Sequence, residues 1–200
     1  MIIKRANTKH PIALDLSLRW SPRAFNPDKN ITREQIIQLC EAARWAPSCN
    51  GEEPWRYLVF DRQTNPDAWQ KAFECLTDRN QRWVKNVPLL YAAIADTIFL
   101  KGKDNPWGKY DTGAASENLC LQAVSLGMAA HQMAGFDPAK LAEMFSIPER
   151  YEPVAMIAVG FQAAEDTLEE DLREREKAER FRRPLEDTFF DGEWGNSISE

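Results

Sequence analysis

The feature that most constrains the fold is the run from Asp111 to Met128, in which Ala, Leu and Val fall on nearly all sides of a helix. A helix that is apolar all round is usually buried, so we expect this one in the middle of the molecule. Two other runs, Val87–Ala95 and Val154–Phe161, are apolar almost throughout, as central strands are. The sequence therefore predicts a core built from one buried helix and two central strands.

Capping signals and charge patterns predict the shorter elements around this core. Thr32 with Gln35 forms a capping box, which predicts a helix over 33–46 that ends before Pro47. The other expected elements are a strand over 56–61, a helix beginning at Asn65-Pro66, a short helix from Asp137-Pro138 through Phe145, and a helix over 165–180 with acids early and bases late.

Composition bounds the class of protein. The chain of 200 residues is 44% apolar, which fits a single domain over 1–200. Its net charge of −6 argues against nucleic-acid and anionic-membrane partners. No apolar run approaches the about 20 residues of a membrane span, and no signal-peptide pattern is present, so we expect a cytoplasmic protein.

Metal and thiol chemistry are not indicated. The four cysteines show no C-x-x-C spacing and are expected to be free thiols, mostly in the core. His10 and His131 have no ligand-like spacing, so no metal site is expected. Cys49 and His131 are a weak nucleophile–base candidate, because Cys49 follows a helix C-terminus whose dipole raises a thiol pKa.

Two cationic segments are candidates for phosphate binding. The first segment, Arg19-Trp20-Ser21-Pro22-Arg23, carries two arginines whose forked, permanently charged donors suit a phosphate. The same sequence is also compatible with a solvated surface segment that binds nothing. The second segment, Arg180, Arg182 and Arg183 before Pro184, either holds a phosphate or ends an acidic helix favourably.

Two further segments suit a flat ligand. Gly135, within Gln132–Asp137, permits close backbone approach to a planar ring, or else ends a turn between two helices. Asn80 is placed to bond a pyrimidine edge, and Trp83 packs either near a ring or in the core. The sequence has no G-x-G-x-x-G and no Walker A motif, so it has no Rossmann dinucleotide site.

Several of these segments occur in the order found in the FMN-dependent nitroreductase family, which the chain resembles over essentially its whole length. They are R-x-S-x-R at 19–23, A-P-S at 46–48 before Pro54-Trp55, an Asn before the apolar strand, and a G-F-D turn at 135–137. The resemblance implies an α+β fold with a central, mostly antiparallel sheet flanked by helices. It also implies an intertwined homodimer with FMN sites at the interface, in which residues 184–200 form an arm on the partner subunit.

The resemblance also implies roles for particular residues. The expected cofactor-binding residues are Arg19, Trp20, Ser21 and Arg23 for the phosphate and ribityl chain, Pro47, Ser48, Cys49 and Asn50 for the partner's flavin, Asn80 for the ring, Ala134 and Gly135 for N5, and Arg180 and Arg182 for the phosphate. No side chain is expected as a catalytic acid or base, because flavin N5 carries the hydride.

The implied activity is reduction of a small oxidised acceptor, such as a nitroaromatic or a quinone, by NAD(P)H at a single flavin site. Gly51 and Glu53 depart from the Asn and Gln that the family pattern has in this loop, which leaves acceptor preference open. Two alternatives remain: a specialised flavin enzyme of the same fold, such as a dehalogenase or a flavin-destroying enzyme, and a non-catalytic flavin-binding or sensory protein.

Overall fold

A four-stranded antiparallel sheet forms the centre of the molecule. The computed structural model describes residues 2–198, and its strands are β1 (Trp55–Asp61), β2 (Leu89–Asp96), β3 (Ala129–Met133) and β4 (Tyr151–Gly160). They lie in the order β1-β2-β4-β3, and every neighbouring pair is antiparallel. The predicted α+β class with an antiparallel sheet is confirmed.

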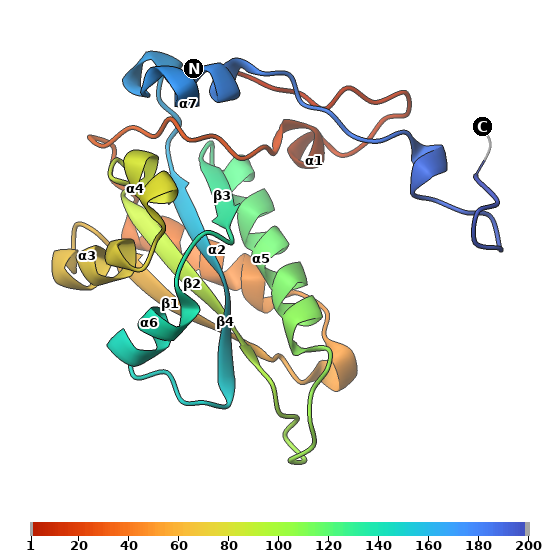
Figure 1. The fold of residues 1–200 in the computed structure, drawn as a ribbon, viewed down its shortest axis with the longest axis horizontal. Coiled ribbons are helices and arrows are strands. Elements are labelled where there is room, and N and C mark those ends of the chain that lie inside the picture. Colours follow the sequence, from red (N-terminus) through yellow and green to blue (C-terminus); the bar gives the residue numbers. More distant parts are fainter. Residues whose placement is uncertain (1, 199–200) are drawn as a thin grey trace.

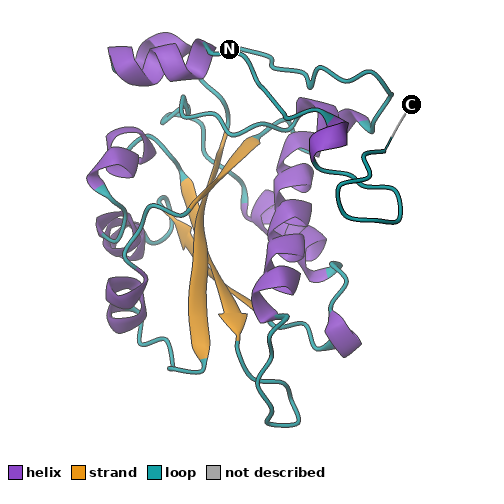
Figure 2. Cartoon of the chain, turned by 45° about the vertical axis from the view of Figure 1, so that its right-hand side comes forward, coloured by secondary structure: helices purple, strands orange, loops and turns teal. Residues whose placement is uncertain are grey.

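Helices cover both faces of this sheet (Figures 1 and 2). One face carries α2 (Arg33–Arg44) and α5 (Gly108–Ser125). The other carries α3 (Pro66–Glu74), α4 (Asp78–Val84) and α6 (Pro138–Met144). Two short helices, α1 (Leu14–Leu18) and α7 (Glu170–Lys177), lie across one end of the sheet.

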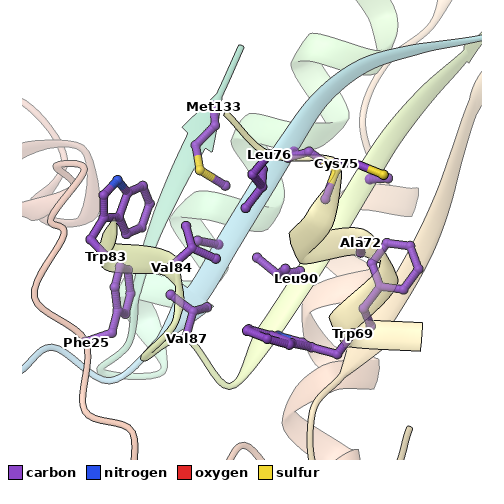
Figure 3. Packing of buried hydrophobic residues seen from close by; sticks show 14 of the residues in the cluster. Phe25, Trp69, Ala72, Cys75, Leu76, Trp83, Val84, Val87, Leu90 and Met133 are labelled. Atoms are coloured by element: carbon purple, nitrogen blue, oxygen red, sulfur yellow. The ribbon is translucent and has the colours of Figure 1, made fainter. Parts of the chain in front are cut away.

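The central strand β2 explains why its sequence shows no alternation. Successive side chains of a strand point to opposite faces. Leu89 and Tyr91 pack in the cluster beneath α2 and α5, whereas Leu90 packs with Trp69 and Trp83 beneath α3 and α4 (Figure 3). Because both faces are covered by helices, both alternating sets of side chains are apolar, and all positions of β2 are buried.

The segment before α2 is fixed to the same end of the sheet. Phe25 pairs with Gln162 just after β4, and Asn26 N donates to Phe161 O at 2.9 Å. Ala163 N donates to Ala24 O at 2.9 Å. Residues 19–25, far from β4 in sequence, therefore lie beside the chain that leads into α7.

Several predicted boundaries were wrong. Strand β3 and helix α4 were not predicted. Gln132 and Met133 belong to β3, so the turn between two helices expected there is not formed. The helix expected over 165–180 is a 3₁₀ turn at Glu165–Thr167 followed by α7, because the chain is extended at Leu168, whose side chain is buried. The cysteines were expected to lie mostly in the core. Cys75 and Cys120 are buried, whereas Cys40 is exposed and Cys49 is half-buried.

Candidate functional site

One cavity collects predicted site residues from distant parts of the chain. It has a volume of about 340 Å³ and lies between the 19–25 segment, α4 and the end of β3. Its lining consists of Arg23, Thr77, Arg79, Asn80, Trp83, His131, Gln132, Met133, Ala134, Gly135 and Leu172. This lining includes two arginines and no carboxylate, so the cavity favours an anionic or electron-rich ligand.

Gly135 closes one wall of this cavity by direct contact with α4. Its carbonyl accepts hydrogen bonds from Asn80 Nδ2 at 2.9 Å, Thr77 Oγ1 at 3.1 Å and Thr77 N at 3.0 Å. A Cβ at this position would lie 2.6 Å from Asn80 Nδ2 and 3.0 Å from Thr77 Oγ1. Only glycine allows α4 and the end of β3 to approach so closely.

The two predicted cationic segments meet near the cavity. Burial lowers the pKa of Arg180, and the neighbouring guanidinium groups of Arg19 and Arg182 lower it further. Arg180 also donates to the carbonyl oxygens of Lys4 at 2.7 Å and Ser17 at 3.0 Å. Residues more than 150 positions apart therefore form one positively charged cluster.

Contacts with Lys4, α5 and α7 hold the 19–23 segment in place. Arg19 Nε lies 3.2 Å from Glu117 Oε1 of α5, and Arg19 donates to Ser21 Oγ at 3.4 Å. The ammonium of Lys4 lies 4.6 Å from the centre of the Trp20 ring. The backbone N–H of Arg23 donates to the Glu176 carboxylate at 2.9 Å, which fixes this segment to α7.

The loop with Pro47, Ser48, Cys49 and Asn50 does not join this cavity within one chain. Cys49 N donates to Asp111 Oδ2 at 3.0 Å, which places the loop beside the first turn of α5. Figure 1 shows it (orange) at the far end of α5 from α1 and α7. A single chain therefore contains all the predicted segments but brings only some of them together.

A second cavity, of about 580 Å³, lies in the C-terminal segment and is lined by Phe181, Arg182, Arg183, Leu185, Thr188 and Phe189. Among the predicted site residues it includes only Arg182. Its walls come from one short stretch of sequence whose large apolar side chains are exposed. The smaller cavity, assembled from distant segments, is the better candidate site.

The cavity residues that sequence reasoning missed include Thr77 and Leu172, and two with titratable side chains, Arg79 and His131. Arg79 directly precedes Asn80 on α4, and its charge contributes to a lowered pKa of Arg23, for which burial is the largest cause. His131 was considered only as a metal ligand and as a partner of Cys49, but it stacks on Trp83 with ring centres 4.7 Å apart. No pattern in the sequence marks either residue, because each reaches the cavity through the tertiary packing of α4 and β3.

His131 is held neutral in this site. Its Nδ1 lies 2.8 Å from Pro22 O, and because a carbonyl can only accept, Nδ1 carries the proton. Burial lowers its pKa to about 4, with smaller contributions from Arg23 and Arg19, while the bond to Pro22 acts in the opposite direction. The ring therefore links β3 to the 19–23 segment as an uncharged hydrogen-bond donor.

Among residues 2–198, no group of three or more His, Cys, Asp or Glu side chains is placed to hold a metal ion. No helix in that part of the chain is long and apolar enough to cross a membrane.

Substitution of Gly135 by Ala is expected to lower the free energy of unfolding by about 1 kcal/mol, because the new Cβ displaces Asn80 and breaks its hydrogen bond. Urea unfolding measures this. Gly113→Ala is the control, since a Cβ there meets no atom within 4 Å and a helix interior favours Ala by up to about 1 kcal/mol. Equal effects of the two substitutions would contradict the close-approach argument.

The lowered pKa of His131 predicts a pH-dependent stability. The pKa of His131 is about 6.5 in the unfolded state and about 4 in the folded state. Between these two pH values the unfolded state binds more protons than the folded state, so stability falls as the pH falls. From pH 7 to pH 5 the loss from this group is about 2 kcal/mol. We expect His131→Asn, whose amide retains a donor for Pro22, to lack this component in urea titrations. A variant with the same pH profile as the wild-type protein would exclude His131 as its source.

Comparisons with known proteins identify the family and the fold of the chain. Residues 16–161 match the model of the nitroreductase family. A crystal structure described as an oxidoreductase containing FMN has a TM-score of 0.87 and 32% identity, covering 94% of this chain and 95% of that one. The sequence is 35% identical over 152 residues to an uncharacterised 15.4 kDa protein of Mycolicibacterium smegmatis, covering 72% of this chain and 99% of that protein.

A more distant relative carries an activity in its name. The major NAD(P)H-flavin oxidoreductase of Aliivibrio fischeri is 22% identical over 208 residues, covering 84% of this chain and 95% of that protein. The fold, the order of the segments and the extent of these matches agree, and the chain belongs to the nitroreductase family.

Proposed function

We propose that this protein is an FMN-dependent oxidoreductase that uses NAD(P)H to reduce small oxidised acceptors such as nitroaromatics or quinones. The observation that carries the proposal is the meeting of Arg23, Asn80 and Gly135 around one cavity with no carboxylate in its lining. Membership of the nitroreductase family and the names of its relatives support it.

The residues at the cavity fit the chemical groups of FMN. The cluster of Arg19, Arg180 and Arg182 supplies the positive charge that a phosphate dianion needs. The Nδ2 group of Asn80 donates a hydrogen bond to the carbonyl of Gly135. The Oδ1 of Asn80 is then available as an acceptor for an N–H on the edge of a flavin ring. Gly135 has no side chain and therefore contributes backbone atoms to the cavity lining, which suits a flat ligand.

FMN, when bound, supplies the hydride-transfer chemistry, and the protein supplies binding, orientation and electrostatics. Arg23 and Arg79 place two positive charges at the cavity, where they favour electron-rich groups. No side chain is assigned as a catalytic acid or base. The resemblance to the family implies that the nicotinamide donor and the acceptor use the same cavity in turn, and the missing Rossmann motif is consistent with this.

A second copy of the chain is proposed to complete the site. Glu53 N donates to Ser48 Oγ at 3.0 Å, and Asn50 and Glu53 adopt positive φ angles of 56° and 47°. The loop with Pro47, Ser48, Cys49 and Asn50 is thus ordered, with the nearby Trp45 ring 77% exposed. Since one chain leaves it away from the cavity, we propose that a homodimer brings it to the partner's flavin.

The C-terminal arm supports the same proposal. Figure 1 shows residues 184–198 extending away from the body of the molecule. Among the described residues, the hydrogen bonds of 184–198 stay within the segment. Phe189 and Trp194 are exposed, Trp194 by 93%. Apolar side chains on an unsupported arm suit burial against a second copy. Residues 199–200 of the predicted arm lie outside the described residues, and the cytoplasmic location stays a prediction.

An absorption spectrum of the purified protein, recorded before and after anaerobic addition of NADH and then NADPH, tests the proposed function. We expect a flavin spectrum that bleaches, with the faster donor identifying the preference. A flavin spectrum that neither donor bleaches would support the flavin-binding or sensory alternative. Absence of flavin even after FMN is added would overturn the proposal.

Deletion of residues 184–200 is expected to weaken the dimer, because it removes the exposed apolar side chains of the arm. Sedimentation equilibrium should show an increased dimer dissociation constant, and circular dichroism should show retained helix content. A truncated protein that stays dimeric to the same dilution as the full chain would contradict the crossing arm.

A further inference from the structure

Helix α7 carries a carboxylate buried beside the cationic segment. Glu176 is 1% exposed, the lowest fraction of any Asp or Glu among the described residues. Its two oxygens accept from Arg23 N at 2.9 and 3.0 Å, and Oε1 also accepts from Ala24 N at 3.1 Å. The guanidinium of Arg23 lies 4.0 Å from the same carboxylate. A charge is rarely buried without such compensation.

Helix α7 is itself fixed to the wall of the cavity. Arg82 of α4 donates from Nε to Glu169 at 2.8 Å and also pairs with Asp171 at the start of α7. Leu172 is buried in the core cluster beneath α4. Because α4 also carries Asn80, these contacts set the position of Glu176 relative to the cavity.

Electrostatics alone would argue against a carboxylate at this place. A negative charge close to a phosphate site repels the phosphate and lowers its affinity. Hydrogen bonds act in the opposite direction, since two adjacent backbone N–H groups bound to one fixed carboxylate restrict the backbone of Pro22–Ala24. That restriction reduces the loss of conformational freedom when the segment binds a ligand.

We propose that Glu176 is a positioning residue that preorganises the Arg19–Arg23 segment for the phosphate of FMN. The inference rests on the proposed function, and it adds a residue about 150 positions away from the segment that it orders. Glu176 contacts the backbone of the segment rather than the ligand. It orients Arg23 directly, and by fixing the backbone at this point it also sets the positions of Arg19 and Ser21.

Comparison of FMN with riboflavin, which lacks the phosphate, tests this role. In Glu176→Gln the isosteric amide turns an NH₂ group toward a backbone donor, so one of the backbone hydrogen bonds is lost. We expect FMN binding to weaken about tenfold in fluorescence titrations, and riboflavin binding to change by less than about twofold. Glu174→Gln is the matched control, because it removes the same charge from an exposed position of α7 and should leave both affinities unchanged.

Unchanged FMN binding by Glu176→Gln would overturn the proposal, and so would tighter binding, which would show that the carboxylate acts as a repelling charge. Equal weakening of both flavins would also overturn it, since that is the result of a general structural defect. A wild-type protein that binds no FMN would overturn the proposed function and this inference together. A wild-type protein that prefers FMN, with a variant that keeps the preference, would overturn this inference alone.

Hydrogen exchange of the wild-type protein provides a second test that does not depend on the folding of a variant. In the flavin-free protein, the amides of Arg23 and Ala24 are expected to be protected from exchange, because Glu176 already holds them. Amides that exchange as fast as those of exposed loops, and become protected only when FMN is added, would contradict preorganisation.

Discussion

Burial of β2 on both faces is the constraint on which the rest of the structure depends. A strand with both faces covered needs partners on both sides and helices above and below. β1 and β4 supply the partners, and α2 with α5 and α3 with α4 supply the two layers. This arrangement places the end of β3, the start of α4 and the chain following β4 at one end of the sheet, where the cavity forms.

The site is held in shape by contacts between backbone and side chains rather than by the cations themselves. The carbonyl of Gly135 binds Thr77 and Asn80, His131 binds Pro22, and Glu176 binds the N–H groups of Arg23 and Ala24. Each of these contacts joins segments distant in sequence. The positive charges of a phosphate site repel one another, so an ordered backbone is needed to keep them together before a ligand arrives.

Sequence reasoning recovered the elements whose signals are local. The capping box at Thr32, the Asn65-Pro66 start and the apolar runs of β2 and β4 identified helices and strands that the structure contains. β3 was missed because it is only five residues long and includes His131 and Gln132 among its apolar positions. Arg79 and Glu176 carried no signal, since their roles arise only when α4, α7 and the 19–23 segment pack together. The family and fold expectations are confirmed, whereas the site residues stay predictions.

We propose that segments far apart in sequence form one FMN site, completed by a second copy of the chain. Amide chemical-shift mapping of the labelled protein during an FMN titration tests it most directly. We expect the largest changes in residues 19–24, 77–83, 131–135 and 180–182, together with the 47–50 loop that lies away from the cavity in a single chain. Changes confined to residues 181–189, around the larger cavity of the arm, would contradict it.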